Sequence, residues 1–201
     1  NEIINQYTEI TGKPMMPPAF ALGYHQSRWG YMSYNEVSLV MRQLDAHNIP
    51  YDSIWLDLDH LDEKIPFTHN DQTFGEIDEL MTELEEQNRF LIRISDPHFP
   101  SNVNDPHFKE GRRNKLFVKT SKSMTFIGDG WPGQCAFPDF MNPTTIDWWS
   151  RLYNYGVDIS RENVFPWNDM NEPSIFKGFE ATFPKDALHY GDFENREVHN
   201  I

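Results

Sequence analysis

The sequence predicts an α/β protein with a parallel sheet, and two patterns carry this prediction. Short apolar runs of strand length alternate along the chain with longer segments whose apolar residues recur at helical spacing. Each apolar run is followed at once by polar or aromatic residues, as in enzymes built on the carboxyl ends of parallel strands. Four such units occur in 201 residues, whereas a closed (β/α)₈ barrel takes about 250. The pattern alone leaves open a small open-sheet domain or part of a barrel.

The first unit follows a polar lead-in. An apolar run over residues 19–24 predicts the first strand, and Trp29 lies among the polar residues at its exit. Ser33 and Glu36 have the spacing of a capping box, so a helix is expected from there to about His47.

The second and third strands are expected at residues 53–57 and 90–94. Between them, apolar residues on one face predict a helix over residues 76–87. The second strand ends in the carboxylate of Asp57, and the third is followed by the polar residues 95–98. Polar groups therefore gather at the exits of both strands.

The region near residues 100–141 is less regular, and we expect it to be an elaborated loop. It contains a candidate short helix over residues 105–114, an extended segment over 116–119 and a glycine-rich loop over 128–133. No further strand of the main sheet is predicted here.

The fourth unit completes the pattern. Asn142 and Pro143 form a good helix start, with Asn as the cap and Pro in the first turn, and Gly156 is expected to end the helix. The fourth strand is expected at residues 164–168.

Composition narrows the class of partner. The apolar and charged fractions, 38% and 24%, are those of a soluble globular protein. A formal net charge of -14 argues against nucleic acid and anionic membranes, because both would repel the chain, whereas neutral sugars would not. No apolar run approaches the roughly 20 residues that span a bilayer, so no membrane insertion is expected. The single Cys135 excludes an internal disulfide framework.

The fourth strand is followed by the most informative stretch of the chain. Asp169 comes directly after it, between the amides of Asn168 and Asn171, which could donate hydrogen bonds to an ionised carboxylate. Such donors keep a carboxylate charged and nucleophilic. By residue type alone, the commoner explanation is a turn with helix-capping chemistry that ends in Glu172.

Residues 167–173, Trp-Asn-Asp-Met-Asn-Glu-Pro, resemble the nucleophile signature of glycoside hydrolase family 31, the α-glucosidase family. Residues 185–191 are similar to the members that trim glucose from N-linked glycans. The resemblance implies that residues 17–201 form the N-terminal half of a (β/α)₈ TIM barrel of about four βα units, after a lead-in over residues 1–16. It also implies that the general acid lies beyond Ile201.

By this resemblance Asp169 is the catalytic nucleophile. Retaining glycosidases place the acid about 5 to 5.5 Å from it. Glu172 is unsuited to that role, because side chains three residues apart on a helical turn face the same side. The resemblance places Asp57 on the hydroxyl groups of the bound glucose, and a helix or loop cap is the alternative for this residue.

The resemblance also implies an apolar wall around the glucose, since aromatic faces suit the C–H faces of a sugar. Packing in the core is the alternative for the tryptophans. The side chains expected in the substrate subsite are Trp29, Leu58, Trp131, Trp167, Met170 and Phe176.

No metal or cofactor is expected, because the chain has no His-x-His or His-Glu-x-x-His arrangement. His60 and His98 suit structural hydrogen bonds, and Asp96 is expected in a supporting role. Pro166 departs from the family pattern and removes a backbone donor, which puts the pairing of the fourth strand in question.

The function implied by the resemblance is a retaining exo-α-glucosidase that hydrolyses terminal α-linked glucose. Its expected substrate is an α-glucoside or a glucosylated N-glycan, its compartment the lumen of the endoplasmic reticulum, and its protein partner a regulatory β subunit. The chain by itself is expected to be inactive. The alternatives are another family 31 α-glucosidase or α-xylosidase, and a catalytically silent carbohydrate-binding remnant.

Overall fold

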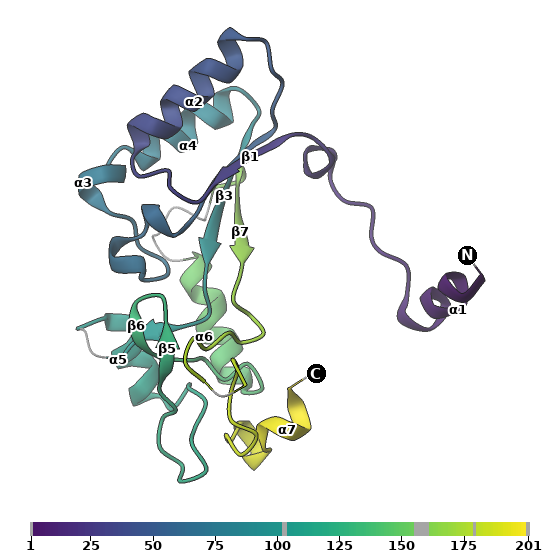
Figure 1. The fold of residues 1–201 in the computed structure, drawn as a ribbon, viewed down its shortest axis with the longest axis vertical. Helices are drawn as coiled ribbons and strands as arrows, with labels where there is room; N and C mark the ends of the chain where they lie inside the picture. The colour runs from purple at the N-terminus through teal and green to yellow at the C-terminus, as the bar shows by residue number, and fades with distance from the viewer. Residues whose placement is uncertain (1, 102–103, 155–160, 179, 200–201) are drawn as a thin grey trace.

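A computed structural model describes residues 2–101, 104–154, 161–178 and 180–199. Its centre is a parallel sheet of four strands in the order β1-β2-β3-β7 (Figure 1). The strands are β1 (His25–Arg28), β2 (Ser53–Leu56), β3 (Phe90–Ser95) and β7 (Val164–Asn168). The predicted parallel α/β architecture is therefore confirmed.

The first strand begins later in the chain than predicted. The apolar run over residues 19–24 does not enter the sheet, because Ala19–Leu22 forms the 3₁₀ turn η1, and β1 is the polar segment that follows. The ring of Phe20 stacks on Phe90 with centroids 3.9 Å apart. Phe20 thus packs at the start of β3, whereas the other residues of the run are exposed.

Side-chain partners explain why a polar segment can be a strand. The indole Nε1 of Trp55 donates to His25 Nδ1 at 2.9 Å, and Gln26 Nε2 donates to the hydroxyl of Tyr31 at 2.7 Å. These bonds satisfy polar groups that hydrophobic patterning would place in a loop.

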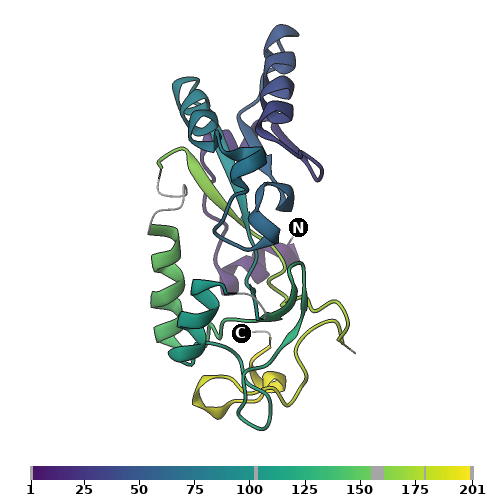
Figure 2. The same cartoon turned by 90° about the vertical axis from the view of Figure 1, so that its left-hand side faces the viewer.

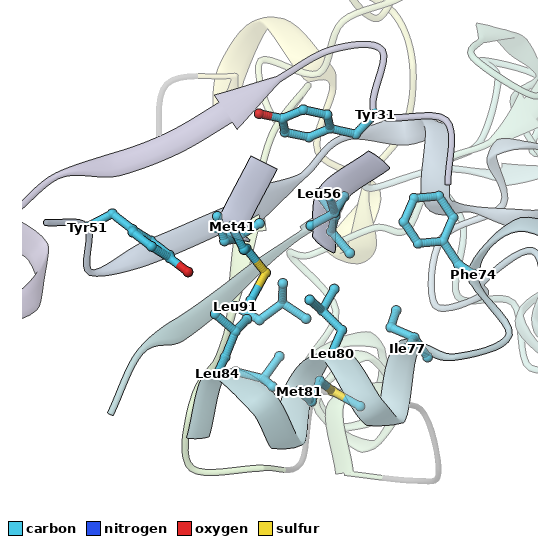
Figure 3. Close-up of a cluster of buried hydrophobic side chains, with 13 residues drawn as sticks. Tyr31, Met41, Tyr51, Leu56, Phe74, Ile77, Leu80, Met81, Leu84 and Leu91 are labelled. Atoms are coloured by element: carbon cyan, nitrogen blue, oxygen red, sulfur yellow. The ribbon is translucent and has the colours of Figure 1, made fainter. Parts of the chain in front are cut away.

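Two predicted helices, α2 (Tyr34–Ala46) and α4 (Ile77–Glu86), pack against one face of the sheet. Ser33 caps α2 by accepting the N–H of Glu36 at 3.3 Å, as the capping box predicted, whereas the Glu36 carboxylate reaches the N–H of Met32. The core between helices and strands, partly shown in Figure 3, comprises Tyr31, Val37, Met41, Tyr51, Ile54, Leu56, Phe74, Ile77, Leu80, Met81, Leu84, Leu91 and Val164. Each large side chain buried there contributes about 1.5–3 kcal/mol.

Short elements connect β2 to α4. They are the 3₁₀ turns η2 (Leu58–His60) and η3 (Asp62–Lys64) and the helix α3 (Asp71–Phe74). The side chain of Asn70 caps α3 by accepting the N–H groups of Gln72 and Thr73.

The region expected as an elaborated loop contains a second, antiparallel sheet in the order β4-β6-β5. Its strands are β4 (Phe99–Pro100), β5 (Gly128–Gly130) and β6 (Gly133–Ala136). The glycine-rich loop is therefore the hairpin of β5 and β6, and Gly133 at φ 107° supplies the left-handed residue after its turn. The extended segment at 116–119 makes isolated bridges only.

The helices of this region follow the prediction. α5 (Pro106–Arg113) is capped by Asp105, and α6 (Pro143–Asn154) begins after Asn142, whose side chain accepts the N–H of Thr144 at 3.0 Å. The predicted end of α6 at Gly156 lies outside the described residues. Figure 2 shows α6 and α5 side by side. An apolar cluster around them comprises Phe67, Phe99, Phe108, Leu116, Phe117, Ala136, Trp148 and Leu152.

Pro166 does not interrupt the pairing of β7 with β3. The N–H of Leu91 donates to the carbonyl of Asn163 at 2.9 Å. The backbone N–H and C=O groups of successive residues point to alternate sides of a strand, so those of Phe165 and Trp167 also point towards β3. The N–H that Pro166 lacks would point away from β3, so its absence removes no bond to that strand. β7 therefore pairs with β3 as a regular parallel strand, although the sequence had put this pairing in question.

The two ends of the described chain differ in how they pack against the rest of the molecule. α1 (Glu2–Thr11), a helix the sequence did not predict, buries none of its residues and lies apart from the rest (Figure 1). The C-terminal part, with η4 (Tyr190–Asp192) and α7 (Asn195–Val198), is held by Asp139, whose Oδ1 lies 2.9 Å from His189 Nδ1. Among the described helices, none is long and apolar enough to cross a membrane.

Candidate active site

Three aspartates lie at the C-terminal ends of strands in the main sheet. Asp57, Asp96 and Asp169 are each the first residue after a strand, namely β2, β3 and β7. The register pairs Ile94 with Trp167, two residues before Asp96 and Asp169. Because side chains alternate between faces, both aspartates point to the face opposite the helix-packed core, and Asp57 shares that face.

Burial and mutual repulsion act on these carboxyl groups together. Burial, and to a lesser extent the negative charges of Asp169 and Asp57, raise the pKa of Asp96 to about 7. Burial also raises the pKa of Asp57, against the stabilising N–H of Leu58, and the charges of Asp59 and Asp169 add to the rise. Asp96 is therefore partly protonated near neutral pH.

Asp96 is the least compensated of the three. Its side chain is buried, and within the described part of the chain neither carboxyl oxygen has a hydrogen-bond partner. His98 Nε2 lies 3.8 Å from Asp96 Oδ2, and burial lowers the pKa of His98 to about 4, so the imidazole is neutral at pH 7. A neutral acid beside a neutral imidazole is the arrangement that costs least here.

Asp57 caps the turn that follows it and leaves one carboxyl oxygen without a partner in the described chain. One oxygen, Oδ1, accepts the N–H of Leu58 at 2.7 Å and so caps η2. Among the described residues the second oxygen has no hydrogen-bond partner. The cap fixes the carboxylate without consuming it, and one oxygen stays available for a ligand.

Three of the predicted wall residues form a continuous aromatic row. The rings of Trp29 and Trp131 meet edge to face with centroids 5.6 Å apart, and Trp131 meets Phe176 at 4.7 Å. Trp131 lies in the hairpin turn between β5 and β6, so the second sheet carries one side of the site. The ammonium of Lys64 lies 5.3 Å from the Trp131 ring centroid.

The remaining predicted residues lie closer to the sheet. Leu58 is buried with Ile94, and Trp131 and Trp167 pack against them. Trp167 also meets the ring of Trp55 at 5.2 Å. Leu58 and Trp167 therefore pack around Ile94, on the face of the sheet that also carries the aspartates.

Met170, directly after Asp169, has φ 62°, a left-handed conformation that is uncommon for a residue with a side chain. Such backbone strain is concentrated at functional sites. Glu172 is exposed in the following loop. The chain thus changes direction abruptly at the predicted nucleophile.

Sequence reasoning underrated two residues. Asp96 was expected only as support, although its position directly after a strand was a visible signal. Asp59 accepts the N–H of Gly30 at 2.6 Å and so fixes the turn that carries Trp29. The alternation Asp-Leu-Asp after β2 was the available signal for this contact.

One cavity formed by the described residues lies away from these carboxylates. This cavity, of about 440 Å³, is lined by residues near Phe126, Ile175 and Pro184, and by none of the three aspartates. Within the described ranges, no group of three or more His, Cys, Asp or Glu side chains could hold a metal ion. The aspartates and the aromatic row lie on the open face of the sheet.

Parallel strands with carboxylates at their exits are typical of α/β enzymes, which include the barrel class. The family model of the Glycosyl hydrolases family 31 TIM-barrel domain matches residues 14–201. The chain therefore belongs to glycoside hydrolase family 31, as its motif at residues 167–173 indicated.

Individual relatives agree with the family. The chain is 43% identical to human Neutral alpha-glucosidase AB over 202 residues, which is 100% of this chain and 21% of the relative. A crystal structure of an ER glucosidase II heterodimer, made of catalytic subunit and binding domain of the regulatory subunit, superimposes with TM-score 0.93 and 45% identity over 98% of this chain and 22% of that one. A glucosidase II α-subunit structure bound to Glc1Man2 gives TM-score 0.93 and 44% identity, over 98% of this chain and 21% of that one. The chain thus spans about a fifth of the length of the relatives it matches.

Proposed function

We propose that this chain carries the nucleophile-bearing part of a retaining exo-α-glucosidase that removes terminal α-linked glucose. The observation that carries the proposal is the position of Asp169, in the family motif and directly after β7, beside Asp57 and Asp96 on the open face of the sheet. Family membership supports a glycosidase, and the geometry supports this residue as the one that attacks.

In the proposed reaction the Asp169 carboxylate attacks the anomeric carbon of the glucose. The bond to the leaving oxygen breaks, that oxygen takes a proton from a general acid, and a glycosyl-enzyme ester forms. The residue that gave up its proton then acts as a base and takes a proton from water, which hydrolyses the ester, releases glucose and returns the Asp169 carboxylate. Asp57 binds hydroxyl groups of the sugar, and Trp29, Trp131 and Phe176 wall its apolar faces.

Neither Glu172 nor Asp96 is suitably placed to be the second carboxyl group of the reaction. Glu172 is exposed in the loop, and Asp96 is enclosed. We propose that the acid comes from residues that follow the matched fifth of the protein, in a full-length enzyme whose barrel this chain begins.

The trimming of N-linked glycans is the task that the relatives favour. The glucosidase II α subunit has been solved with Glc1Man2 bound, and the heterodimer with part of a regulatory subunit. We propose a glucosylated N-glycan as substrate, a regulatory β subunit as partner and the lumen of the endoplasmic reticulum as compartment.

The direct test is hydrolysis of p-nitrophenyl α-glucoside by the full-length protein that contains this chain. The Asp169→Asn variant should lose turnover by at least about a thousandfold, as nucleophile removal does in other enzymes. Asp147→Asn, the same change at an exposed position of α6, is the matched control and should keep it. A wild-type protein that binds glucosides without turnover would instead be a silent carbohydrate-binding remnant.

A further inference from the structure

The backbone of Asp57 is held by a buried histidine. His60, the last residue of η2, is 1% exposed, and its Nδ1 lies 2.6 Å from the carbonyl oxygen of Asp57. Its Nε2 lies 3.2 Å from the Nε of Arg93, whose side chain is 2% exposed. One imidazole thus joins the carbonyl of Asp57 to a guanidinium on β3.

The chemistry of the partners fixes the tautomer of His60. A guanidinium can only donate, so Nε2 of His60 must accept from Arg93. The proton is therefore on Nδ1, which donates to the carbonyl of Asp57. Burial, and then the charge of Arg93, hold the pKa of His60 well below its usual value, so the ring stays neutral at physiological pH. The connection is therefore intact at physiological pH.

The same guanidinium anchors the loop that follows Asp57. Arg93 Nη2 donates to the carbonyl of Thr68 at 3.2 Å, and the register pairs Arg93 with Leu56, the residue before Asp57. Arg93 projects from the face opposite that of the Asp57 carboxylate, because Arg93 and Ile94 alternate along β3. It can therefore act on Asp57 only through the backbone.

We propose that His60 and Arg93 are positioning residues, which set the Asp57 carboxylate for the sugar by holding its carbonyl. This inference rests on the proposed function, in which Asp57 binds the hydroxyl groups of glucose. The Asp57 side chain is already fixed at one oxygen by Leu58, so a shift of its backbone moves the free oxygen directly. Misplacement of a binding group by about 1 Å can cost about 100-fold in rate.

Two substitutions at one site separate positioning from packing. His60→Phe keeps the ring, which packs edge to face on Phe74 at 6.1 Å, and removes both hydrogen bonds. His60→Asn loses the ring, but its amide can replace the Nδ1 donor to Asp57. We expect kcat/KM on p-nitrophenyl α-glucoside to fall about 10- to 100-fold in His60→Phe, and to recover partly in His60→Asn although that variant packs worse.

The deciding measurement is a double-mutant cycle in the full-length protein. His60→Phe, Asp57→Ala and the double variant are compared by kcat and KM, with the thermal midpoint of each recorded. If His60 acts through Asp57, the double variant should be no worse than Asp57→Ala alone. Additive losses, or a His60→Phe variant with wild-type kcat/KM, would overturn the inference.

Failure of the proposed function would look different. A wild-type protein that does not turn over any glucoside refutes that function, and the cycle is then run on the Kd for deoxynojirimycin, a glucose-like probe. Non-additive losses of binding support the positioning role of His60 by themselves. If the wild-type protein does not bind the probe either, both the proposed function and this inference are wrong.

Discussion

At the scale of single residues, three aspartates at equivalent strand ends differ in what surrounds them. Asp57 is capped by the N–H of Leu58, Asp96 is enclosed without a hydrogen-bond partner in the described chain, and Asp169 begins a loop with a left-handed residue. The same residue type is therefore suited to binding, to holding a proton and to attack.

Substitution of Asp57 should damage catalysis more than folding. Charged hydrogen bonds to buried hydroxyls are worth about 1.5–3 kcal/mol, so Asp57→Ala should lower kcat/KM about 10- to 100-fold. The lost η2 cap should cost only about 1 kcal/mol of stability. Steady-state kinetics and thermal unfolding of the full-length enzyme measure both. Wild-type kcat/KM in this variant would show that Asp57 is a cap only.

Asp96 should make stability fall as the pH rises. Its pKa is about 7 in the folded chain against the usual 3.8 of an aspartate, so its protonated form is favoured by folding. Its contribution is fully present below about pH 4 and is lost as the pH rises through about 7, by an amount on the order of a few kcal/mol. Asp96→Asn should remove this loss.

The comparison of Asp96→Asn with wild type is needed because His98 acts in the opposite sense. Its pKa is lowered from 6.5 to about 4, so its contribution is present at neutral pH and is lost as the pH falls through about 4. Thermal midpoints of wild type and Asp96→Asn are therefore compared at pH 5 and pH 8. Equal pH dependence in the two proteins would contradict the burial of Asp96.

At the scale of elements, sequence reasoning succeeded where the local signal and the tertiary fold agree. α2 and α6 begin at their predicted cap residues, and β7 has the predicted bounds. It failed for β1, because hydrophobicity favoured residues 19–24, whereas the real strand satisfies its polar groups through Trp55 and Tyr31. Such partners are distant in sequence and are invisible to periodicity.

The candidate site, too, was predicted only in part from the sequence. The positions of Asp57, Asp169 and the tryptophans followed from the family motif and from strand ends. The isolation of Asp96 and the link from Arg93 through His60 did not, because burial and tautomers depend on contacts between elements.

α5 offers a test of packing against intrinsic helix propensity. Gly111 is buried in this helix, and a methyl group added there would overlap the ring of Phe117. Alanine should gain about 1 kcal/mol in helix propensity, but overpacking costs about 1–3 kcal/mol. We expect Gly111→Ala to lower the thermal midpoint, whereas Lys109→Ala at an exposed position of α5 should not. A midpoint raised by Gly111→Ala would mean that α5 does not pack on Phe117 as described.

At the scale of the whole molecule, the sheet is covered on one face only. The helices bury one face, whereas on the other face Trp29 and Phe165 are 63% and 37% exposed. β1 and β7 are the edge strands of the described sheet. An open parallel sheet with exposed aromatic side chains is what the first half of a barrel would present.

The 201 residues alone should therefore fold poorly and should not hydrolyse α-glucosides. Exposed strand edges promote aggregation, and the lack of a positioned acid costs about 10² to 10⁴ in rate. Size-exclusion chromatography and turnover of p-nitrophenyl α-glucoside by the purified monomer test this. Turnover that disappears in Asp169→Asn would show that the acid lies within these residues, with Asp96 the first to examine.

We propose Asp169 as the residue that attacks the sugar. Incubation of the full-length enzyme with a fluorinated α-glucosyl trap, followed by peptide mapping, observes that bond directly. We expect one modified peptide, residues 164–174 or a digest product that contains them, with the sugar on Asp169. A sugar bonded to Asp57, Asp96 or any other residue would contradict it.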